Sequence, residues 1–129
     1  MTSLTHAGVT TILPVMNMDR ARRFYEGKLG LEPEGFAADG NYMFACGKGD
    51  HIALIPKPEG TKSDYTAMSF EVQSIEKVIT ELEGEGIRFE DYDMPNLKTA
   101  NHICVLGSEK AAWFKDTEGN FLCLHEQLH

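Results

Sequence analysis

Two stretches of the chain combine a strand-like apolar pattern with a helix-like pattern that follows it directly. In the first stretch, residues 9–15 are mostly β-branched or apolar, and Asn17 can then cap a helix. Apolar residues in this helix recur at the spacing of one helical face, and Gly30 stands where a C-cap glycine belongs. These apolar residues are Ala21, Phe24, Tyr25 and Leu29. The pattern predicts a strand followed by an amphipathic helix.

The second stretch repeats this order in the other half of the chain. Residues 68–72 alternate like a half-buried strand, Ser74 can cap the next helix, and Gly84 and Gly86 can end it. The apolar face of this helix consists of Ile75, Val78, Ile79 and Leu82. Because the strand–helix unit occurs twice, the sequence predicts an internal repeat.

Short strand-like segments follow each helix, separated by turns that contain glycine. They cover residues 31–38, 42–46 and 51–55 in the first half, and 87–92, 111–115 and 121–125 in the second, with a short edge strand at 102–106. The order is βαβββ in each half, and one such unit buries its sheet poorly. We therefore expect a single α+β domain, residues 1–129, in which modules 5–58 and 63–129 form a curved mixed sheet with the helices outside.

The composition narrows the class of protein. The 129 residues carry 12 Lys and Arg against 20 Asp and Glu, a net charge of −8, and 42% of them are hydrophobic. This apolar share suffices for a core, whereas the excess of carboxylates would repel nucleic acid and anionic membrane surfaces. No apolar run approaches the roughly 20 residues that cross a bilayer, and the N-terminus lacks a signal-peptide pattern. Three widely spaced cysteines make no disulfide framework, so we expect a cytoplasmic protein.

Three segments carry a resemblance to a known superfamily. Residues 15–21, 24–31 and 112–122 resemble the strand–helix entry, the helix end and the final hairpin of the vicinal oxygen chelate superfamily. This superfamily includes glyoxalase I, bleomycin-resistance proteins and extradiol dioxygenases. In the hairpin, Thr117-Glu118 replaces the family's Pro-Asp. The resemblance implies a concave cavity and a homodimer, but it does not fix the function, because members range from lyases, epimerases and dioxygenases to non-catalytic drug binders.

Metal-using members of the superfamily resemble one another in placing four ligands, usually His, Gln or Glu, on the concave face. The resemblance assigns these positions to Thr10, Ala53, Ala67 and Cys123. A register shift by one would exchange Ala53 for Leu54. Two alanines and one thiol cannot make the usual site, so we expect no metal cofactor there. A non-standard metal site stays open as an alternative, and its candidate ligands are His51, Glu71 and His125.

Two further patterns suggest catalysis. Residues 125–129 match the H-E-x-x-H motif of zinc proteases, but that motif needs a helix, and the residues before it resemble a strand. Cys123 and His125 could pair as nucleophile and base, yet residues two apart on one strand lie about 7 Å apart. We therefore interpret the motif as a coincidence and Cys123 as a buried thiol.

Without the metal, the expected cavity still presents aromatic and polar side chains that suit a small organic ligand. We expect the ligand-binding residues to be Tyr42, Phe44, Tyr65, Ser69, Glu71, Trp113 and His125. Lys98 or His102 could contribute from the long loop. Such a site suits a flat aromatic molecule, and a cationic one if Glu71 takes part. Taken singly, each aromatic residue is better explained by core packing or a dimer contact.

We therefore expect a metal-free protein that binds and sequesters a small molecule, as in the bleomycin-resistance branch. The alternative is an enzyme of the same superfamily, of the lyase, isomerase or dioxygenase type. It would use a non-standard metal site, or metal-free acid–base chemistry by Glu71 or His125. A third hypothesis, a protein-interaction module, predicts a large apolar surface patch in place of a pocket.

Overall fold

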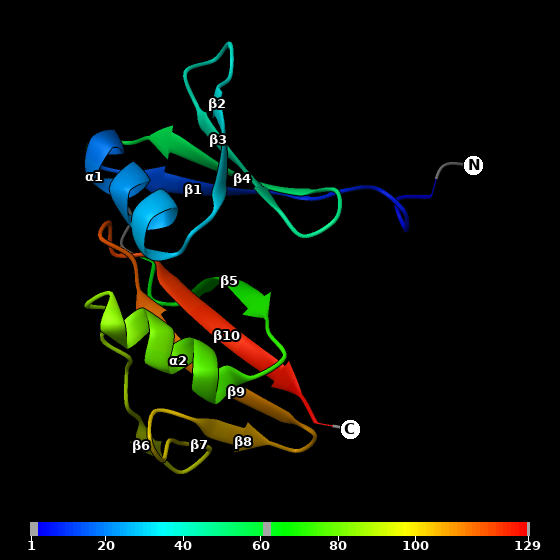
Figure 1. The fold of residues 1–129 in the computed structure, drawn as a ribbon, viewed down its shortest axis with the longest axis vertical. Coiled ribbons are helices and arrows are strands. Elements are labelled where there is room, and N and C mark those ends of the chain that lie inside the picture. The colour runs from blue at the N-terminus through cyan, green and yellow to red at the C-terminus, as the bar shows by residue number, and fades with distance from the viewer. Residues whose placement is uncertain (1–2, 61–62, 129) are drawn as a thin grey trace. The chain divides into compact units, whose positions relative to one another are not determined.

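A computed structural model describes residues 3–60 and 63–128, and the chain divides into two compact units, residues 1–61 and 62–129 (Figure 1). Each unit contains helix and a four-stranded mixed sheet, which confirms the α+β class. The N-terminal unit contains β1 (Thr10–Val15), α1 (Met18–Arg22), η1 (Arg23–Lys28), β2 (Glu32–Phe36), β3 (Tyr42–Cys46) and β4 (Asp50–Pro56). Its strands lie in the order β1-β4-β3-β2, with β1 parallel to β4 and the other pairs antiparallel.

The first helix begins as the sequence predicts and then changes its winding. The Asn17 side chain accepts a hydrogen bond from the Arg20 backbone N–H at 3.0 Å, which confirms the cap. From Arg23 the helix continues as a π-helix, in which the Leu29 N–H reaches the Phe24 carbonyl. Gly30 then takes the left-handed conformation, with φ of 72°, that the end of the helix requires.

Strand pairing decides which residues enter the core of the N-terminal unit. Leu13 and Val15 are buried, whereas Ile12, which precedes Leu13, is 59% exposed, so alternate residues of β1 face opposite sides. In the sheet, Leu13 lies beside Leu54, and Leu54 lies beside Tyr42. Partners across a sheet share a face, so Tyr42 belongs to the buried side.

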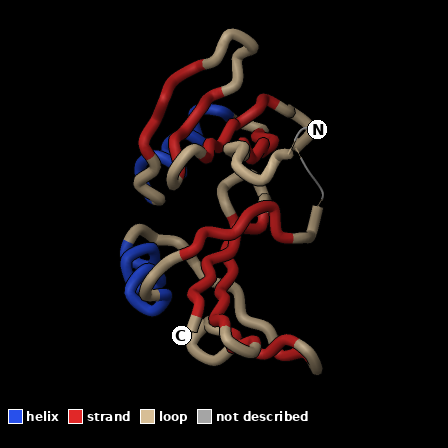
Figure 2. Tube along the Cα trace, turned by 90° about the vertical axis from the view of Figure 1, so that its right-hand side faces the viewer, coloured by secondary structure: helices blue, strands red, loops and turns tan. Residues whose placement is uncertain are grey.

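The C-terminal unit contains a second sheet with one longer helix. Its elements are β5 (Thr66–Glu71), α2 (Ile75–Gly84), β6 (Asp93–Met94), β7 (Leu97–Lys98), β8 (Cys104–Leu106), β9 (Glu109–Lys115) and β10 (Phe121–Gln127). The sheet order is β5-β10-β9-β8, with β5 parallel to β10, and β6 pairs with β7 in a separate small hairpin. Helix α2 lies along one face of this sheet (Figures 1 and 2).

The start of α2 differs from the prediction in the identity of its cap. Ser74 holds the N-cap position, but its side chain makes no capping hydrogen bond. Instead, Oε1 of Glu126 on β10 accepts from the backbone N–H of Ile75 at 2.8 Å. A carboxylate satisfies a free N–H at a helix start and also interacts favourably with the helix dipole. The cap therefore comes from a strand far along the chain.

One predicted strand is not formed, whereas residues 125–127 lie in a strand and not in a helix, as the sequence indicates. Residues 87–92 do not form a strand, since only an isolated bridge joins Phe89 to Phe114 on β9. Strand β10 continues to Gln127, so His125 and Glu126 lie in a strand. The helix that a zinc-protease motif needs is absent from residues 121–127, and His129 lies outside the described residues.

In the part of the chain that the structure describes, no helix is long and apolar enough to span a membrane.

Candidate functional site

Several of the predicted ligand-binding residues share the face of the C-terminal sheet that α2 does not cover. We refer to it as the helix-free face and define it by two rows of paired residues. One row is Ser69, Cys123 and Trp113 on β5, β10 and β9, and the next is Glu71, His125 and Ala111 on the same strands. The neighbours that alternate with them on β9 and β10, Phe114, Leu122 and Leu124, are buried on the other face.

Three polar side chains, linked by one hydrogen bond and one longer ion-pair contact, join the two rows. The Ser69 hydroxyl oxygen lies 2.6 Å from Nδ1 of His125, and Nε2 of His125 lies 3.7 Å from Oε1 of Glu71. The His125 side chain is half-buried, whereas that of Glu71 is 74% exposed. A neutral imidazole has one donor and one acceptor nitrogen. When the Ser69 hydroxyl donates to Nδ1, the N–H at Nε2 is directed towards the Glu71 carboxylate.

Cys123 lies beside this chain as a neutral thiol. Burial raises its pKa, and a hydrogen bond with Ser69 opposes that shift only in part. The thiol donates to the carbonyl of Leu124 at 3.3 Å. A thiol that keeps its proton is a poor nucleophile and a poor metal ligand. The structure therefore gives no support to Cys123 as a reactive group.

Trp113 supplies the aromatic surface of the helix-free face. Its side chain is partly exposed, and the ring of Tyr92 meets it edge to face, with centroids 5.6 Å apart. Burial raises the pKa of Tyr92, with Glu90 as the next cause. Sequence reasoning missed Tyr92, because it lay at the end of a segment predicted as a strand. The contact between Tyr92 and Trp113 depends on the path of the loop that contains Tyr92, and a local sequence pattern does not encode that path.

Two of the predicted aromatic residues have a different role. Tyr42 and Phe44 are buried on the helix side of the N-terminal sheet, with ring centroids 5.3 Å apart. The Arg22 guanidinium lies 4.0 Å above the Tyr42 ring and donates to its hydroxyl at 3.2 Å. These rings form part of the core beneath α1. The expectation that they line an open cavity face is therefore wrong, because the pairing with β4 turns them to the other side.

The remaining predicted contributors are scattered. Tyr65 precedes β5 and is 72% exposed. Lys98 is an exposed residue of β7, in the small hairpin. His102 is held by Asp91 and Glu83 beside α2, in a depression described below. The residues that the structure brings together on one face are thus Ser69, Glu71, Trp113 and His125.

The positions that the family uses for metal ligands do not fit a metal in this chain. Ala53 and Ala67 carry only a methyl group, Thr10 offers a neutral hydroxyl, and the Cys123 thiol keeps its proton. His51, a candidate for a non-standard site, binds Glu34 through Nδ1 at 2.7 Å. Within residues 3–60 and 63–128, no group of three or more His, Cys, Asp or Glu side chains could hold a metal ion.

Comparison with known proteins identifies the family. Residues 3–124 match the model of the glyoxalase/bleomycin resistance protein/dioxygenase superfamily. No curated protein matches the sequence. Among solved structures, a glyoxalase family protein from Bacillus anthracis is 20% identical with a TM-score of 0.75, and 98% of each chain is covered.

Two further solved structures share the fold at lower identity. TnmS3, an antibiotic binding protein from Streptomyces sp. CB03234, is 16% identical with a TM-score of 0.71, covering 98% of this chain and 99% of its own. The fosfomycin resistance protein FosX from Listeria monocytogenes is 16% identical with a TM-score of 0.70, covering 97% and 92%. With residues 3–124 matching its model, the chain belongs to the glyoxalase/bleomycin resistance protein/dioxygenase superfamily.

Proposed function

We propose that this protein binds a small organic molecule on the helix-free face of the C-terminal sheet, without a metal ion at Thr10, Ala53, Ala67 and Cys123. The observation that carries the proposal is the placement of Trp113 in the same row as Ser69, whose hydroxyl pairs with His125 in the next row. Ligand sites combine aromatic surface with a few oriented polar groups, and this face supplies both. A protein that only sequesters its ligand needs an aromatic surface and oriented polar groups, and no catalytic group.

The side chains indicate the chemistry of the ligand. The partly exposed indole of Trp113 can stack on a flat aromatic ring. Ser69 and His125 can exchange hydrogen bonds with polar groups at the ring edge. The exposed Glu71 carboxylate adds a negative charge at the same place, which favours a cationic molecule. A flat aromatic cation is the class that fits these groups best.

The relatives support binding as a class of function. One structural neighbour is described as an antibiotic binding protein and another as a fosfomycin resistance protein. The four family ligand positions of this chain lack the donors that metal chemistry needs. We therefore assign no chemical step to a metal at those positions. We also infer, from the family resemblance and the cysteine usage, a homodimer located in the cytoplasm.

A fluorescence titration tests the binding proposal. The probe is 9-aminoacridine, a flat aromatic cation, and its fluorescence anisotropy is followed as protein is added. We expect saturable binding that weakens at least about tenfold in Trp113→Leu, because leucine keeps apolar volume but removes the stacking surface. The matched control is Phe36→Leu, which changes an exposed aromatic residue of the other unit. Equal affinity in wild type and Trp113→Leu would reject Trp113 as a ligand contact.

A second candidate function is metal-free catalysis at the same side chains. It is favoured by the short hydrogen bond between Ser69 and His125, because a hydroxyl that donates to an imidazole nitrogen has the geometry of a nucleophile next to a general base. In acyl transfer, the Ser69 oxygen would bond to the acyl carbon while His125 takes the hydroxyl proton. The leaving group would depart with the electron pair of the broken ester bond.

Ester hydrolysis distinguishes this candidate from simple binding. With 4-nitrophenyl acetate, a catalytic Ser69 predicts turnover above the buffer rate and an acetylated serine in the intact mass. Both signals should disappear in Ser69→Ala and His125→Gln. If the rate stays at the buffer level in wild type while 9-aminoacridine still binds, the face is a binding site only.

A further inference from the structure

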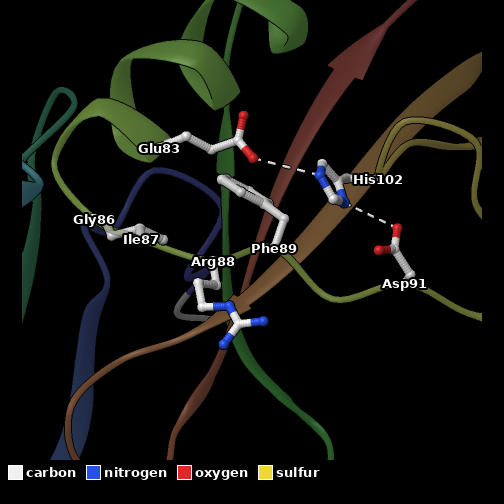
Figure 3. A pocket seen from close by; sticks show the side chains of 7 residues that line it. All are labelled: Glu83, Gly86, Ile87, Arg88, Phe89, Asp91 and His102. Carbon is white, nitrogen blue, oxygen red and sulfur yellow. Dashed lines mark hydrogen bonds and ion pairs between the residues drawn. The ribbon is translucent and has the colours of Figure 1, made fainter.

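A group of charged side chains in the C-terminal unit lies beside the end of α2. Here a surface depression of about 350 Å³ is lined by residues that include Glu83, Arg88, Phe89, Asp91 and His102 (Figure 3). His102 stands between two carboxylates, with Glu83 on the helix and Asp91 on the following loop. Its Nδ1 lies 2.9 Å from Oδ1 of Asp91, and its Nε2 lies 3.4 Å from Oε2 of Glu83.

His102 can bind both carboxylates at once when its ring is protonated. An imidazolium carries a hydrogen on each nitrogen, so one ring donates to Asp91 and attracts Glu83 at the same time. The Phe89 ring lies beside the imidazole, with centroids 6.1 Å apart. The Arg88 guanidinium is directed away from His102 (Figure 3). His102 therefore joins the loop to the end of the helix.

Thr99 connects Asp91 to the next residue of the loop, Tyr92. The Thr99 hydroxyl lies 3.3 Å from Oδ1 of Asp91, the oxygen that also pairs with His102. The same hydroxyl accepts from the Tyr92 backbone N–H at 2.9 Å, and the Thr99 N–H donates to the Tyr92 carbonyl at 2.9 Å. These bonds close the base of the small hairpin of β6 and β7. The backbone of Tyr92 is thus held by the group that contains His102.

The side chain of Tyr92 extends from this loop to the helix-free face. Its ring meets that of Trp113 at 84°, with centroids 5.6 Å apart. The Glu90 N–H donates to the Trp113 carbonyl at 2.8 Å, which sets the loop beside β9 just before Tyr92. Two rings at nearly a right angle form a corner, in which a flat molecule can stack on one ring and meet the other.

We infer that His102 is a positioning residue for the proposed ligand site, because it holds the loop so that Tyr92 stands against Trp113 as a second aromatic wall. This inference rests on the proposed binding function and extends the site beyond the sheet. Glu83 holds the other side of the His102 ring, so the end of α2 also supports the site. The binding face and the depression are then one connected structure.

The first test uses the full chain without ligand. The indole protons of Trp113, the one tryptophan of the chain, sense the ring current of Tyr92. Tyr92→Leu should shift their signals, and His102→Asn should shift them in the same direction. Asparagine tolerates the left-handed backbone at position 102, where φ is 72°. His51→Asn is the matched control and should leave the signals in place, since His51 also pairs with a carboxylate but lies in the other unit.

The second test is a double-mutant cycle on the binding of 9-aminoacridine, followed by fluorescence anisotropy. Tyr92→Leu should weaken binding by about three- to tenfold through the loss of an aromatic contact. His102→Asn should weaken it at least about twofold alone and no further in the Tyr92→Leu background, because a positioning residue acts only through the residue that it positions. Thr99→Val, which removes the connecting hydroxyl, should behave like His102→Asn.

The two tests separate this inference from the binding function on which it rests. Indole signals that stay fixed in Tyr92→Leu or in His102→Asn would overturn the positioning role, whether or not the protein binds the probe. Losses of affinity that simply add in the double variant would also overturn it. If wild type binds no probe while the indole signals shift as expected, the binding function is rejected and the placement of Tyr92 by His102 is supported.

Discussion

The Ser69 hydroxyl lies 2.6 Å from Nδ1 of His125, although 56 positions separate the two residues in the sequence. The parallel pairing of β5 with β10 produces this contact, because it sets Ser69 beside Cys123 and Glu71 beside His125. A serine on one strand then reaches diagonally to the histidine on the next. The same register places Trp113 on the same face. The candidate site is therefore a direct consequence of strand order.

The cap of α2 predicts that Glu126 contributes more to stability than Ser74, the residue to which the local sequence assigns the cap. Glu126→Ala should lower the free energy of unfolding by about 1 kcal/mol, because the Ile75 N–H loses its acceptor. Ser74→Ala should cost clearly less, since the Ser74 side chain makes no capping bond. Urea denaturation followed by circular dichroism measures both. A larger loss in Ser74→Ala than in Glu126→Ala would show that the serine is the real cap.

Two adjacent residues of β1, Ile12 and Leu13, should differ sharply in their contribution to the free energy of unfolding. Leu13→Ala should destabilise the protein by about 2–5 kcal/mol, because Leu13 is fully buried and its removal leaves a cavity. Ile12→Ala should cost less than about 1 kcal/mol, because that side chain is 59% exposed. Chemical denaturation of the two variants gives the comparison. Similar losses in both would contradict the assignment of faces in β1.

Local patterns in the sequence were sufficient to predict most of the helices and strands. The predicted strand 42–46 coincides with β3, and the helix predicted to follow Ser74 and to end at Gly84 or Gly86 corresponds to α2, because the spacing of apolar residues directly encodes such elements. The Asn17 cap and the glycine at the end of the first helix were predictable from residue type, because Asn favours the N-cap and Gly the left-handed conformation after a helix. The family match over residues 3–124 confirms the resemblance that the sequence motifs suggested.

The errors concern contacts between distant parts of the chain. The predicted cavity face is wrong for Tyr42 and Phe44, because their orientation depends on the register with β4, which no local pattern sets. Strand parity did place Ser69 and His125 on a common face, but their 2.6 Å contact depends on how β5 pairs with β10. Tyr92 was missed because it reaches Trp113 from a loop.

Cys123 should make the stability depend on pH in the alkaline range. Burial raises the pKa of its thiol in the folded state, so the native protein keeps a proton that the unfolded chain releases. The stabilisation is fully present below the unfolded pKa of about 8.5 and is lost as the pH rises towards the folded value. Urea denaturation between pH 8 and 10 should show a shallower decline in Cys123→Ala. An unchanged slope in this variant would contradict the raised pKa.

Glu71 should determine whether the site prefers cations. Glu71→Gln should weaken the binding of 9-aminoacridine a few-fold while leaving that of neutral acridine nearly unchanged, because an exposed carboxylate contributes a modest, salt-screened attraction. Anisotropy titrations at low and high salt measure the difference. Glu81→Gln, on the exposed surface of α2, is the matched control. Equal weakening of both compounds would assign Glu71 a structural role instead.

Binding on the helix-free face is tested most directly by a ¹H–¹⁵N correlation spectrum of the labelled protein during titration with 9-aminoacridine. The chain has one tryptophan, so its indole N–H signal reports on Trp113 alone. We predict that this signal shifts together with the amides of Ser69 and His125, all with one dissociation constant. An indole signal that stays fixed while other residues shift, or a spectrum unchanged at millimolar ligand, would contradict the proposed site.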